Sequence, residues 1–221
     1  HYLENLNDAQ REAVLRTEGP SLIIAGAGSG KTRVLTYRMV HLLKQGIRPS
    51  SVLALTFTNK AAREMKERIA GMVGQQLASR LWMGTFHSIF ARILRIEHEA
   101  KGYPADFTIY DAADSKSLVR TIIKDFGLDD KVYKPGTVSS RISNAKNNLI
   151  TAGSYSQNPE FREYDRSIQM PRISEIYKEY QKRCRIAKAY DFDDLLLETN
   201  LLFREHPDIL ARYQSKVDYV L

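Results

Sequence analysis

The segment Ser21–Thr32 (SLIIAGAGSGKT) constrains the fold more than any other part of the sequence. Its early residues, Leu22-Ile23-Ile24, form a short apolar run that predicts a buried strand of a parallel sheet. The stretch Ala25–Gly30 contains three glycines, which permit positive φ angles and let a phosphate group approach the backbone. Lys31-Thr32 then begins a predicted helix, whose free N–H groups and positive dipole end face the loop. This order predicts a phosphate-binding site.

The segment matches the phosphate-loop pattern G-x-x-x-x-G-K-[ST], except that Ala25 stands at the first glycine position. Alanine is small enough for the turn, so the pattern still predicts a site for a nucleoside triphosphate. Lys31 is expected to neutralise the β- and γ-phosphates, and the Thr32 hydroxyl is expected to ligate Mg²⁺. The other loop residues expected to surround the phosphates are Gly26, Ala27, Gly28, Ser29 and Gly30.

Composition excludes several classes of protein. Of the 221 residues, 43 % are hydrophobic, as in an ordinary globular protein, and the sequence shows no signal peptide. No apolar run approaches the ~20 residues that a membrane span needs. The single cysteine, Cys184, excludes an intramolecular disulfide and favours a reducing, cytoplasmic location. A net charge of +7 suggests a polyanionic partner, and His1 is interpreted as a remnant of a tag.

Helix and strand patterns alternate along the first part of the chain. Apolar residues at helical spacing from Val34 to Leu43 continue the helix that begins at Lys31, and Gly46 ends it. Ser51–Phe57 predicts a second strand, Thr58 can cap the next helix, and Leu81–His87 predicts a third strand. This alternation predicts an α/β fold with a doubly wound parallel sheet.

A short helix is expected before the loop, with Asn7 as its N-cap. Gln10 lies three residues later, where the second member of a capping box belongs. Its amide could instead read the edge of an adenine, since it both donates and accepts hydrogen bonds. The residues alone leave both interpretations open.

The character of the sequence changes at about Ser88. Apolar residues recur at helical spacing, and no convincing strand is expected before Val217. We therefore predict an all-helical domain over residues 88–215, inserted into a first domain made of residues 1–87 and 216–221. The first helix of this domain is expected to begin with Ile89. The main helices expected after it are Asp114–Phe126, Val138–Leu149 and Ile173–Ala187.

The predicted helical domain carries most of the excess positive charge. Between Tyr133 and Tyr190 there are 11 Lys and Arg residues against 5 Asp and Glu residues, a net of +6. Basic residues interleaved with aromatic ones suit single-stranded nucleic acid, but the aromatic residues can equally pack a core beneath a solvated basic surface. The sequence leaves both open for Tyr155, Phe161, Tyr164, Tyr177 and Tyr180.

Three carboxylates lie close together in Asp191-Phe192-Asp193-Asp194. They could hold a divalent metal, or they could form the N-cap and acidic first turn of a helix. Cys and His residues are too scattered for a zinc site.

Five motifs occur in an order and at a spacing typical of one family. They are LNDAQ (Leu6–Gln10), AGAGSGKTR (Ala25–Arg33), LTFTNKAAREM (Leu55–Met65), GTFHS (Gly84–Ser88) and DFDDLL (Asp191–Leu196). This series resembles that of the UvrD/PcrA/Rep-type superfamily 1 DNA helicases over nearly the whole chain. The family implies an ATP-driven 3′→5′ translocase on single-stranded DNA, with two RecA-like domains that each carry an inserted domain. The expected fold is therefore a P-loop NTPase (RecA-like) α/β parallel sheet, truncated, with an inserted all-helical domain.

The resemblance also implies roles for individual residues. Gln10 becomes the reader of adenine, so the nucleotide is ATP, and Arg33 is expected to lie along it. Phe57 matches the position on which a DNA base stacks, at ~1–3 kcal/mol per base. The expected contacts to the DNA backbone are Thr85 and His87, with Asn59 and Lys60 near phosphate. The implied partners are single-stranded DNA and 3′-tailed duplex DNA.

The chain departs from the family's pattern near Leu221. The family has an acidic strand motif, an apolar run followed by Asp-Glu, and Val217–Leu221 is similar to its beginning. Asp218 comes too early to be the metal ligand. We therefore expect a piece of a longer enzyme, which binds nucleotide without hydrolysing it efficiently and whose second RecA-like domain is another part of the parent chain. The alternatives are a helicase–nuclease subunit of the RecB/AddA type and a non-catalytic single-strand-binding module.

Overall fold

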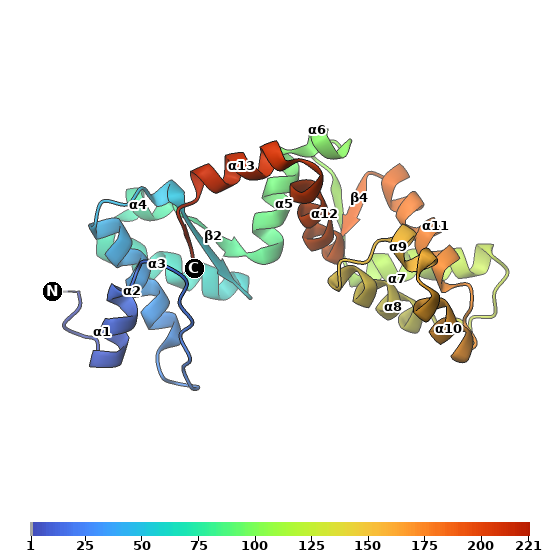
Figure 1. Cartoon of the computed structure of the whole chain (residues 1–221), viewed down its shortest axis with the longest axis horizontal. Coiled ribbons are helices and arrows are strands. Elements are labelled where there is room, and N and C mark those ends of the chain that lie inside the picture. Colours follow the sequence, from blue (N-terminus) through green and yellow to red (C-terminus); the bar gives the residue numbers. More distant parts are fainter. Residues whose placement is uncertain (1) are drawn as a thin grey trace. The chain divides into compact units, whose positions relative to one another are not determined.

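The structure is a computed structural model that describes residues 2–221 (Figure 1). The interpretation of His1 as a tag remnant therefore lies outside the described residues. The chain divides into two compact units: one comprises the chain up to Ile89 together with Asp208–Leu221, and the other comprises Phe90–Pro207. The expected assignment of residues 1–87 and 216–221 to a RecA-like domain, and of 88–215 to an inserted domain, remains a prediction. No helix within residues 2–221 combines the length and the apolar character needed to cross a membrane.

A three-stranded parallel sheet forms the centre of the first unit. β1 (Val52–Thr56) lies between β2 (Trp82–Thr85) and β5 (Tyr219–Val220), and it runs parallel to both. Residues of β1 alternate between buried and half-buried, as expected for a strand inside a covered sheet. The predicted α/β fold with a parallel sheet is confirmed.

Helices of the first unit pack against this sheet and against one another. They are α1 (Asp8–Leu15), α2 (Lys31–Lys44), η1 (Pro49–Ser51), α3 (Asn59–Val73) and α4 (Gln75–Ser79), with α5 (Phe86–Ile96) and α13 (Pro207–Lys216) crossing the unit boundaries. The main core joins Met39 and Leu42 of α2 to Val52 of β1 and to Met65 and Ile69 of α3.

Local signals set the ends of these helices as predicted. The Thr58 side chain accepts a hydrogen bond from the Ala61 N–H and so caps α3. The third predicted strand is shorter than expected, because Phe86 and His87 already belong to α5. The Thr85 hydroxyl accepts a hydrogen bond from the Ser88 N–H at 3.2 Å, which stabilises this early helix start.

The predicted buried strand at Leu22-Ile23-Ile24 is wrong. The segment forms no ladder, and Leu22 and Ile24 are 86 % and 90 % exposed. A strand needs a hydrogen-bonded neighbour, and β5 pairs only with β1. Instead of a ladder, a cavity of about 850 Å³ separates the chain around Ser21 and Ile23 from β5. Two large apolar side chains therefore stay in water, without the roughly 1.5–3 kcal/mol that burial of each would contribute.

The C-terminal segment of the first unit closes over the only tryptophan of the sequence. Trp82 of β2 stacks on Tyr213 of α13, with ring centroids 5.9 Å apart, and the Lys216 ammonium lies 5.0 Å from the Trp82 ring. These contacts join α13 to the sheet within the unit.

The second unit is mostly helical but also contains a small sheet. Its helices are α6 (His98–Lys101), α7 (Ala112–Asp125), α8 (Pro135–Asn147), α9 (Ala152–Gln157), α10 (Pro159–Ser167), α11 (Ile173–Ile186) and α12 (Phe192–Glu205). β3 (Thr108–Tyr110) and β4 (Ala189–Asp191) pair in parallel. The prediction of an all-helical region without strands before Val217 is therefore wrong.

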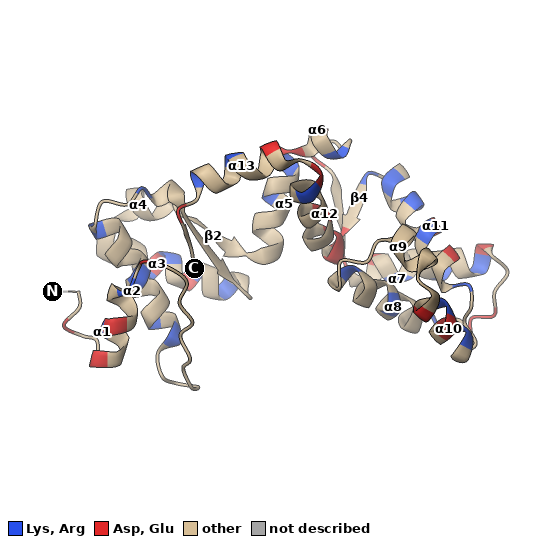
Figure 2. Ribbon diagram, in the orientation of Figure 1, with Lys and Arg blue, Asp and Glu red and all other residues tan. Residues whose placement is uncertain are grey.

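Tyrosines form much of the core of the second unit. Tyr155, Tyr177 and Tyr180 are each at most 2 % exposed and pack among the apolar residues of α7, α8 and α11. The interpretation as a base-stacking surface is therefore wrong for these three, whereas Tyr164 is exposed and lies beneath the Arg141 guanidinium at 4.5 Å. Lys178 and Lys182 of α11 are exposed. Figure 2 shows the basic residues of α11 in blue along its ribbon.

Candidate nucleotide-binding site

The glycine-rich loop of the first unit makes a tight turn immediately before α2. Gly28 and Gly30 have φ angles of 76° and 85°, in the left-handed region that glycine adopts without strain. The Ser29 N–H and hydroxyl both donate to the Gly26 carbonyl, at 3.3 and 2.6 Å. The loop thus satisfies part of its own hydrogen bonding and turns the chain sharply into the helix.

The N-terminus of α2 carries no side-chain cap. Its N-cap residue is Gly30, and no acidic residue lies in the first turn. The first N–H groups of a helix have no partner inside the helix, and together with the dipole they make an anion-binding end. Lys31, Thr32 and Arg33 in this turn are exposed. This chemistry of donors and positive charge fits the phosphates of a nucleotide.

Lys31 and Thr32 lie where the phosphate-loop pattern predicts. The Lys31 ammonium donates to the carbonyl oxygens of Ala25 and Gly26, each at 3.0 Å. Among residues 2–221, no group shares a hydrogen bond with the Thr32 hydroxyl. One exposed hydroxyl at the start of the helix fits a single protein ligand to a phosphate-bound Mg²⁺.

Gln10 fills the first of the two roles that the sequence left open, and its amide also reaches the phosphate loop. Asn7 and Gln10 form a capping box: the Asn7 side chain accepts from the Gln10 N–H at 2.9 Å, and Gln10 Oε1 accepts from the Asn7 N–H at 3.2 Å. The other end of the same amide, Nε2, donates to the Ser29 carbonyl at 3.1 Å. The helix cap therefore places the Gln10 amide directly against the phosphate loop, while its contact with adenine remains a prediction.

Arg33 points away from the loop. Its guanidinium donates to the Asn5 carbonyl at 2.7 Å and lies 5.6 Å from the centre of the Tyr37 ring. The Arg33 side chain therefore joins α2 to the segment before α1. Its expected position along the nucleotide remains a prediction.

The candidate DNA-contacting residues gather where β1 and β2 end. Phe57 follows β1 and is 92 % exposed, with its ring 5.8 Å from that of Phe86. In open parallel sheets this edge, at the carboxyl ends of the strands, is where ligands bind. Thr85 is buried there, whereas His87 is exposed, as are Asn59 and Lys60 in the first turn of α3.

Polar side chains to which the sequence motifs assign no contact also line a small cavity beside these residues. It measures about 320 Å³ and includes Arg63 and Lys66 of α3 and Gly84 of β2. A Cβ atom at Gly84 would lie 2.6 Å from the Ser88 hydroxyl, so this glycine permits close packing of β2 against α5. The sequence does contain a signal for this cavity. Two basic residues, Arg63 and Lys66, lie three positions apart on a helix that follows the end of a strand.

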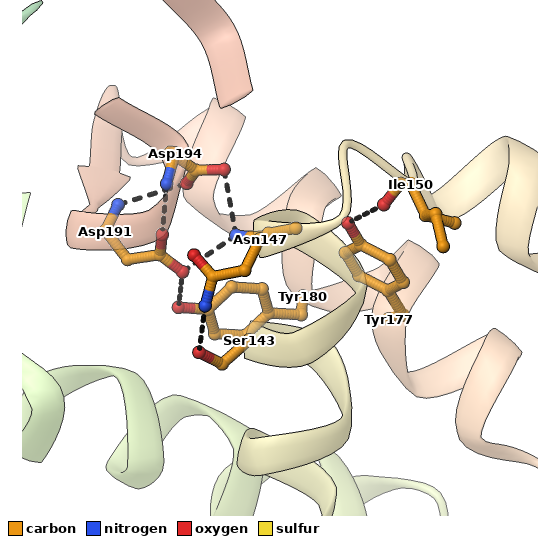
Figure 3. Close-up of polar contacts among 8 residues, drawn as sticks. Ser143, Asn147, Ile150, Tyr177, Tyr180, Asp191 and Asp194 are labelled. Carbon is orange, nitrogen blue, oxygen red and sulfur yellow. Dashed lines mark hydrogen bonds and ion pairs between the residues drawn. The ribbon is translucent and has the colours of Figure 1, made fainter. Parts of the chain in front are cut away.

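Asp191 and Asp194 form a helix cap, not a metal site. Asp191 is the N-cap of α12, and it exchanges capping-box hydrogen bonds with Asp194 (Figure 3). Lys146 of α8 lies 2.7 Å from Asp191 and 2.8 Å from Asp194, and the Tyr180 hydroxyl donates to Asp191 at 2.7 Å. Across residues 2–221, no group of acidic, His and Cys side chains has the arrangement needed to hold a metal ion.

Charge balance in this buried cluster sets its protonation. Burial by itself would lower the pKa of Lys146, but the carboxylates of Asp194 and Asp191 raise it above its usual value. Burial and the neighbouring Asp191 raise the pKa of Asp194 to about 7 despite the opposing Lys146. Burial opposes ionisation of Asp191 as well, yet Lys146 and the Tyr180 hydroxyl hold its pKa below the usual value. Lys146 thus contacts both carboxyl groups, and of the two it is Asp194 whose pKa is raised and Asp191 whose pKa is lowered.

Comparison with known proteins defines the class of this chain. A parallel α/β sheet with many helices is consistent with part of a RecA-like helicase domain. The chain belongs to the UvrD/REP helicase N-terminal domain family, whose model matches residues 6–221.

The curated proteins similar to this chain include DNA helicases. The chain is 44 % identical over 216 residues to the ATP-dependent DNA helicase PcrA of Leuconostoc citreum. The aligned residues make up 97 % of this chain and 28 % of that protein. It is also 44 % identical over 219 residues to the ATP-dependent DNA helicase PcrA of Staphylococcus aureus, covering 99 % of this chain and 29 % of that protein. The chain thus spans less than a third of the length of these relatives.

Proposed function

We propose that this chain is the nucleotide-binding part of an ATP-dependent DNA helicase that moves 3′→5′ along single-stranded DNA. The observation that carries the proposal is the uncapped N-terminus of α2, which presents Lys31 and Thr32 with the Gln10 amide against the same loop. The family and the helicase relatives support it.

The chain's own residues supply binding and charge in this proposal. The α2 N–H groups and Lys31 bind the phosphates and stabilise negative charge as the terminal phosphoryl group is transferred. Thr32 would hold Mg²⁺, which when bound neutralises and bridges phosphate oxygens. Gln10 would select adenine by hydrogen bonds. A second RecA-like domain of the parent protein would complete the site, so this chain alone would bind ATP but hydrolyse it poorly.

DNA would bind at the carboxyl ends of β1 and β2. Phe57 offers an exposed aromatic face for base stacking, which tolerates any base sequence. Lys60 and Asn59 would lie near the phosphates of a single strand. The proposed substrates are single-stranded DNA and duplex DNA with a 3′ tail.

Lys31→Ala in the full-length protein tests the nucleotide site. We expect DNA unwinding and ATP hydrolysis to fall by about 100-fold or more, because a positioned charge on the transferring phosphoryl group is lost. Lys44→Ala, at the other end of α2, is the matched control and should keep full activity. Unwinding retained by Lys31→Ala would refute the proposal, as would single-strand binding by a parent protein that neither binds nor hydrolyses ATP.

Phe57→Ala tests the DNA site. We expect the affinity for single-stranded DNA to fall by about 1–3 kcal/mol, equally for different base sequences, because one stacking contact is removed. Fluorescence anisotropy with labelled oligonucleotides measures this. Leu77→Ala, which removes another exposed apolar side chain of the first unit, should leave the affinity unchanged. Equal losses for the two variants would contradict the proposed stacking role.

A further inference from the structure

Arg38 is a buried cation without an acidic partner. It lies on α2, is only 6 % exposed, and forms no ion pair with any carboxylate of the described chain. Burial lowers the pKa of its guanidinium. Removing a charged group from water is costly unless hydrogen bonds or an opposite charge compensate for the lost hydration. Something other than a carboxylate must therefore hold Arg38 in place.

The compensating groups are backbone carbonyls at the end of another helix. Arg38 Nη1 donates to the Ala13 carbonyl and, at 2.6 Å, to the carbonyl of Arg16, which is the C-cap residue of α1. The last carbonyls of a helix lack partners inside the helix and carry the negative end of its dipole. Arg38 thus satisfies the C-terminus of α1 from the neighbouring helix and balances its own charge there.

Besides the hydrogen bonds from Arg38, α1 is held by the packing of Val14 and of partly buried Ala13. Within this short helix of 8 residues only Val14 is buried, in a small cluster with Leu6 and Val34. At its opposite end, the Gln10 amide touches the phosphate loop through Ser29. A rigid helix that is released at one end can pivot about the remaining contacts, which moves the side chains at the other end.

We propose that Arg38 is a positioning residue for base selection: by fixing the C-terminus of α1, it holds Gln10 at the place where an adenine nucleotide is distinguished from other nucleoside triphosphates. This inference rests on the proposed function, because it takes Gln10 as the residue that contacts the base. The hydrogen bonds of Arg38 go to the carbonyls of Ala13 and Arg16, not to the phosphate loop. Its loss should therefore change the preference among bases and leave the binding of the triphosphate group unchanged.

Competition binding to the full-length protein tests this inference. Binding of ATP, CTP and inorganic tripolyphosphate, each with Mg²⁺, is measured for the wild type, Arg38→Met, Arg38→Lys and Gln10→Ala. We expect the wild type to bind ATP about 3- to 10-fold more tightly than CTP, the range that one net hydrogen bond gives. Arg38→Met should reduce this ratio to near one without changing the affinity for tripolyphosphate. Arg38→Lys keeps the positive charge and one hydrogen bond to α1, so it should keep part of the preference for ATP over CTP.

Two further variants separate positioning from a general structural effect. Arg16→Met removes a nearby exposed positive charge but keeps the carbonyl that Arg38 binds, so its ATP-to-CTP ratio should equal that of the wild type. The double variant Arg38→Met/Gln10→Ala should show no further loss beyond Gln10→Ala, because both changes act through one contact.

The possible results separate the inference from the proposed function. A wild-type preference for ATP that persists in Arg38→Met would overturn the inference and leave the proposed function intact. Weaker tripolyphosphate binding in both Arg38 variants, or their failure to fold by circular dichroism, would assign Arg38 to the fold and also overturn it. A wild type that binds neither ATP nor tripolyphosphate would remove the proposed function and the inference together.

Discussion

Two helix N-termini of this molecule lie beside a lysine, and they are built in opposite ways. At α2 the N-cap is glycine, the first turn has no acid, and Lys31 is exposed. At α12 the cap is Asp191, Asp194 completes a capping box, and Lys146 is wholly buried between the two carboxyl groups. The α12 end supplies its own anions, whereas the α2 end has no carboxylate in its first turn, and Lys31 there donates to the loop carbonyls of Ala25 and Gly26.

The comparison shows how similar local chemistry serves binding or stability. A helix N-terminus that is filled by carboxylates from its own chain becomes part of a core, provided that a cation balances them. A helix N-terminus with glycines and an exposed lysine gains little for the fold but stays accessible to phosphate. Three experiments test this contrast.

Lys146→Met should have the largest effect on stability. Removing the lysine leaves Asp191 ionised in the core without its cation, which typically costs about 3–5 kcal/mol for a buried pair. Urea unfolding followed by circular dichroism measures the loss. Lys182→Met on α11 removes an exposed lysine and should change the free energy of unfolding by less than about 0.5 kcal/mol. Similar values for the two variants would show that the α12 cap does not need its cation.

The pH dependence of Asp194 gives a smaller, graded effect. Because the pKa of Asp194 is raised from 3.8 to about 7, the folded state keeps a proton that the unfolded chain has already lost. The free energy of unfolding of the wild type, compared with that of Asp194→Asn, should therefore fall as the pH rises from about 4 to about 7. The fall should be at most about 1.4 kcal/mol per pH unit.

Urea unfolding of both proteins across that range measures the difference. Tyr180 and Cys184 pack against the cluster from α11, but their pKa values are raised, so both stay neutral there. If the free energy of unfolding of the wild type, minus that of Asp194→Asn, instead increased with rising pH, Asp194 would be ionised in the folded state.

Gly30→Ala should have the smallest effect on stability and a clear effect on the site. The left-handed φ of 85° disfavours alanine, and the added Cβ would lie 2.9 Å from Gln10 Nε2. We expect a loss of about 1 kcal/mol in stability and weaker binding of ATP, measured by isothermal titration calorimetry. Gly26→Ala is the matched control, because its Cβ meets no atom within 4 Å and its φ is not positive. Equal losses of stability in the two variants would show that the turn at Gly30 is not strained by a side chain.

Signals that lie close together in the sequence predicted much of the first unit. The start of α2 at Lys31, the Thr58 cap and the parallel strands β1 and β2 depend on residues within a few positions of each other. The strand expected at Leu22–Ile24 failed because a strand is defined by its neighbour, and no strand of the described chain pairs with it. Apolar character alone does not supply that neighbour.

Long-range pairing explains what the sequence did not predict in the second unit. β3 and β4 are three residues each and pair only because folding brings Thr108 to Ala189. Lysine is rarely buried, so nothing near Lys146 predicts that Asp191, 45 positions later, will balance it. At the candidate site, local sequence patterns pointed to Lys31 and Gln10, whereas the hydrogen bonds from Arg38 to α1 are visible only in three dimensions.

The packing of Trp82 on Tyr213 beneath Lys216 has a practical consequence. Because the sequence has no other tryptophan and all three residues belong to the same unit, emission excited near the red edge of protein absorption originates from that unit alone. Changes in its intensity during denaturation follow the separation of α13 from the sheet. Comparing this optical signal with total ellipticity would reveal whether the two halves of the chain melt together or one after the other.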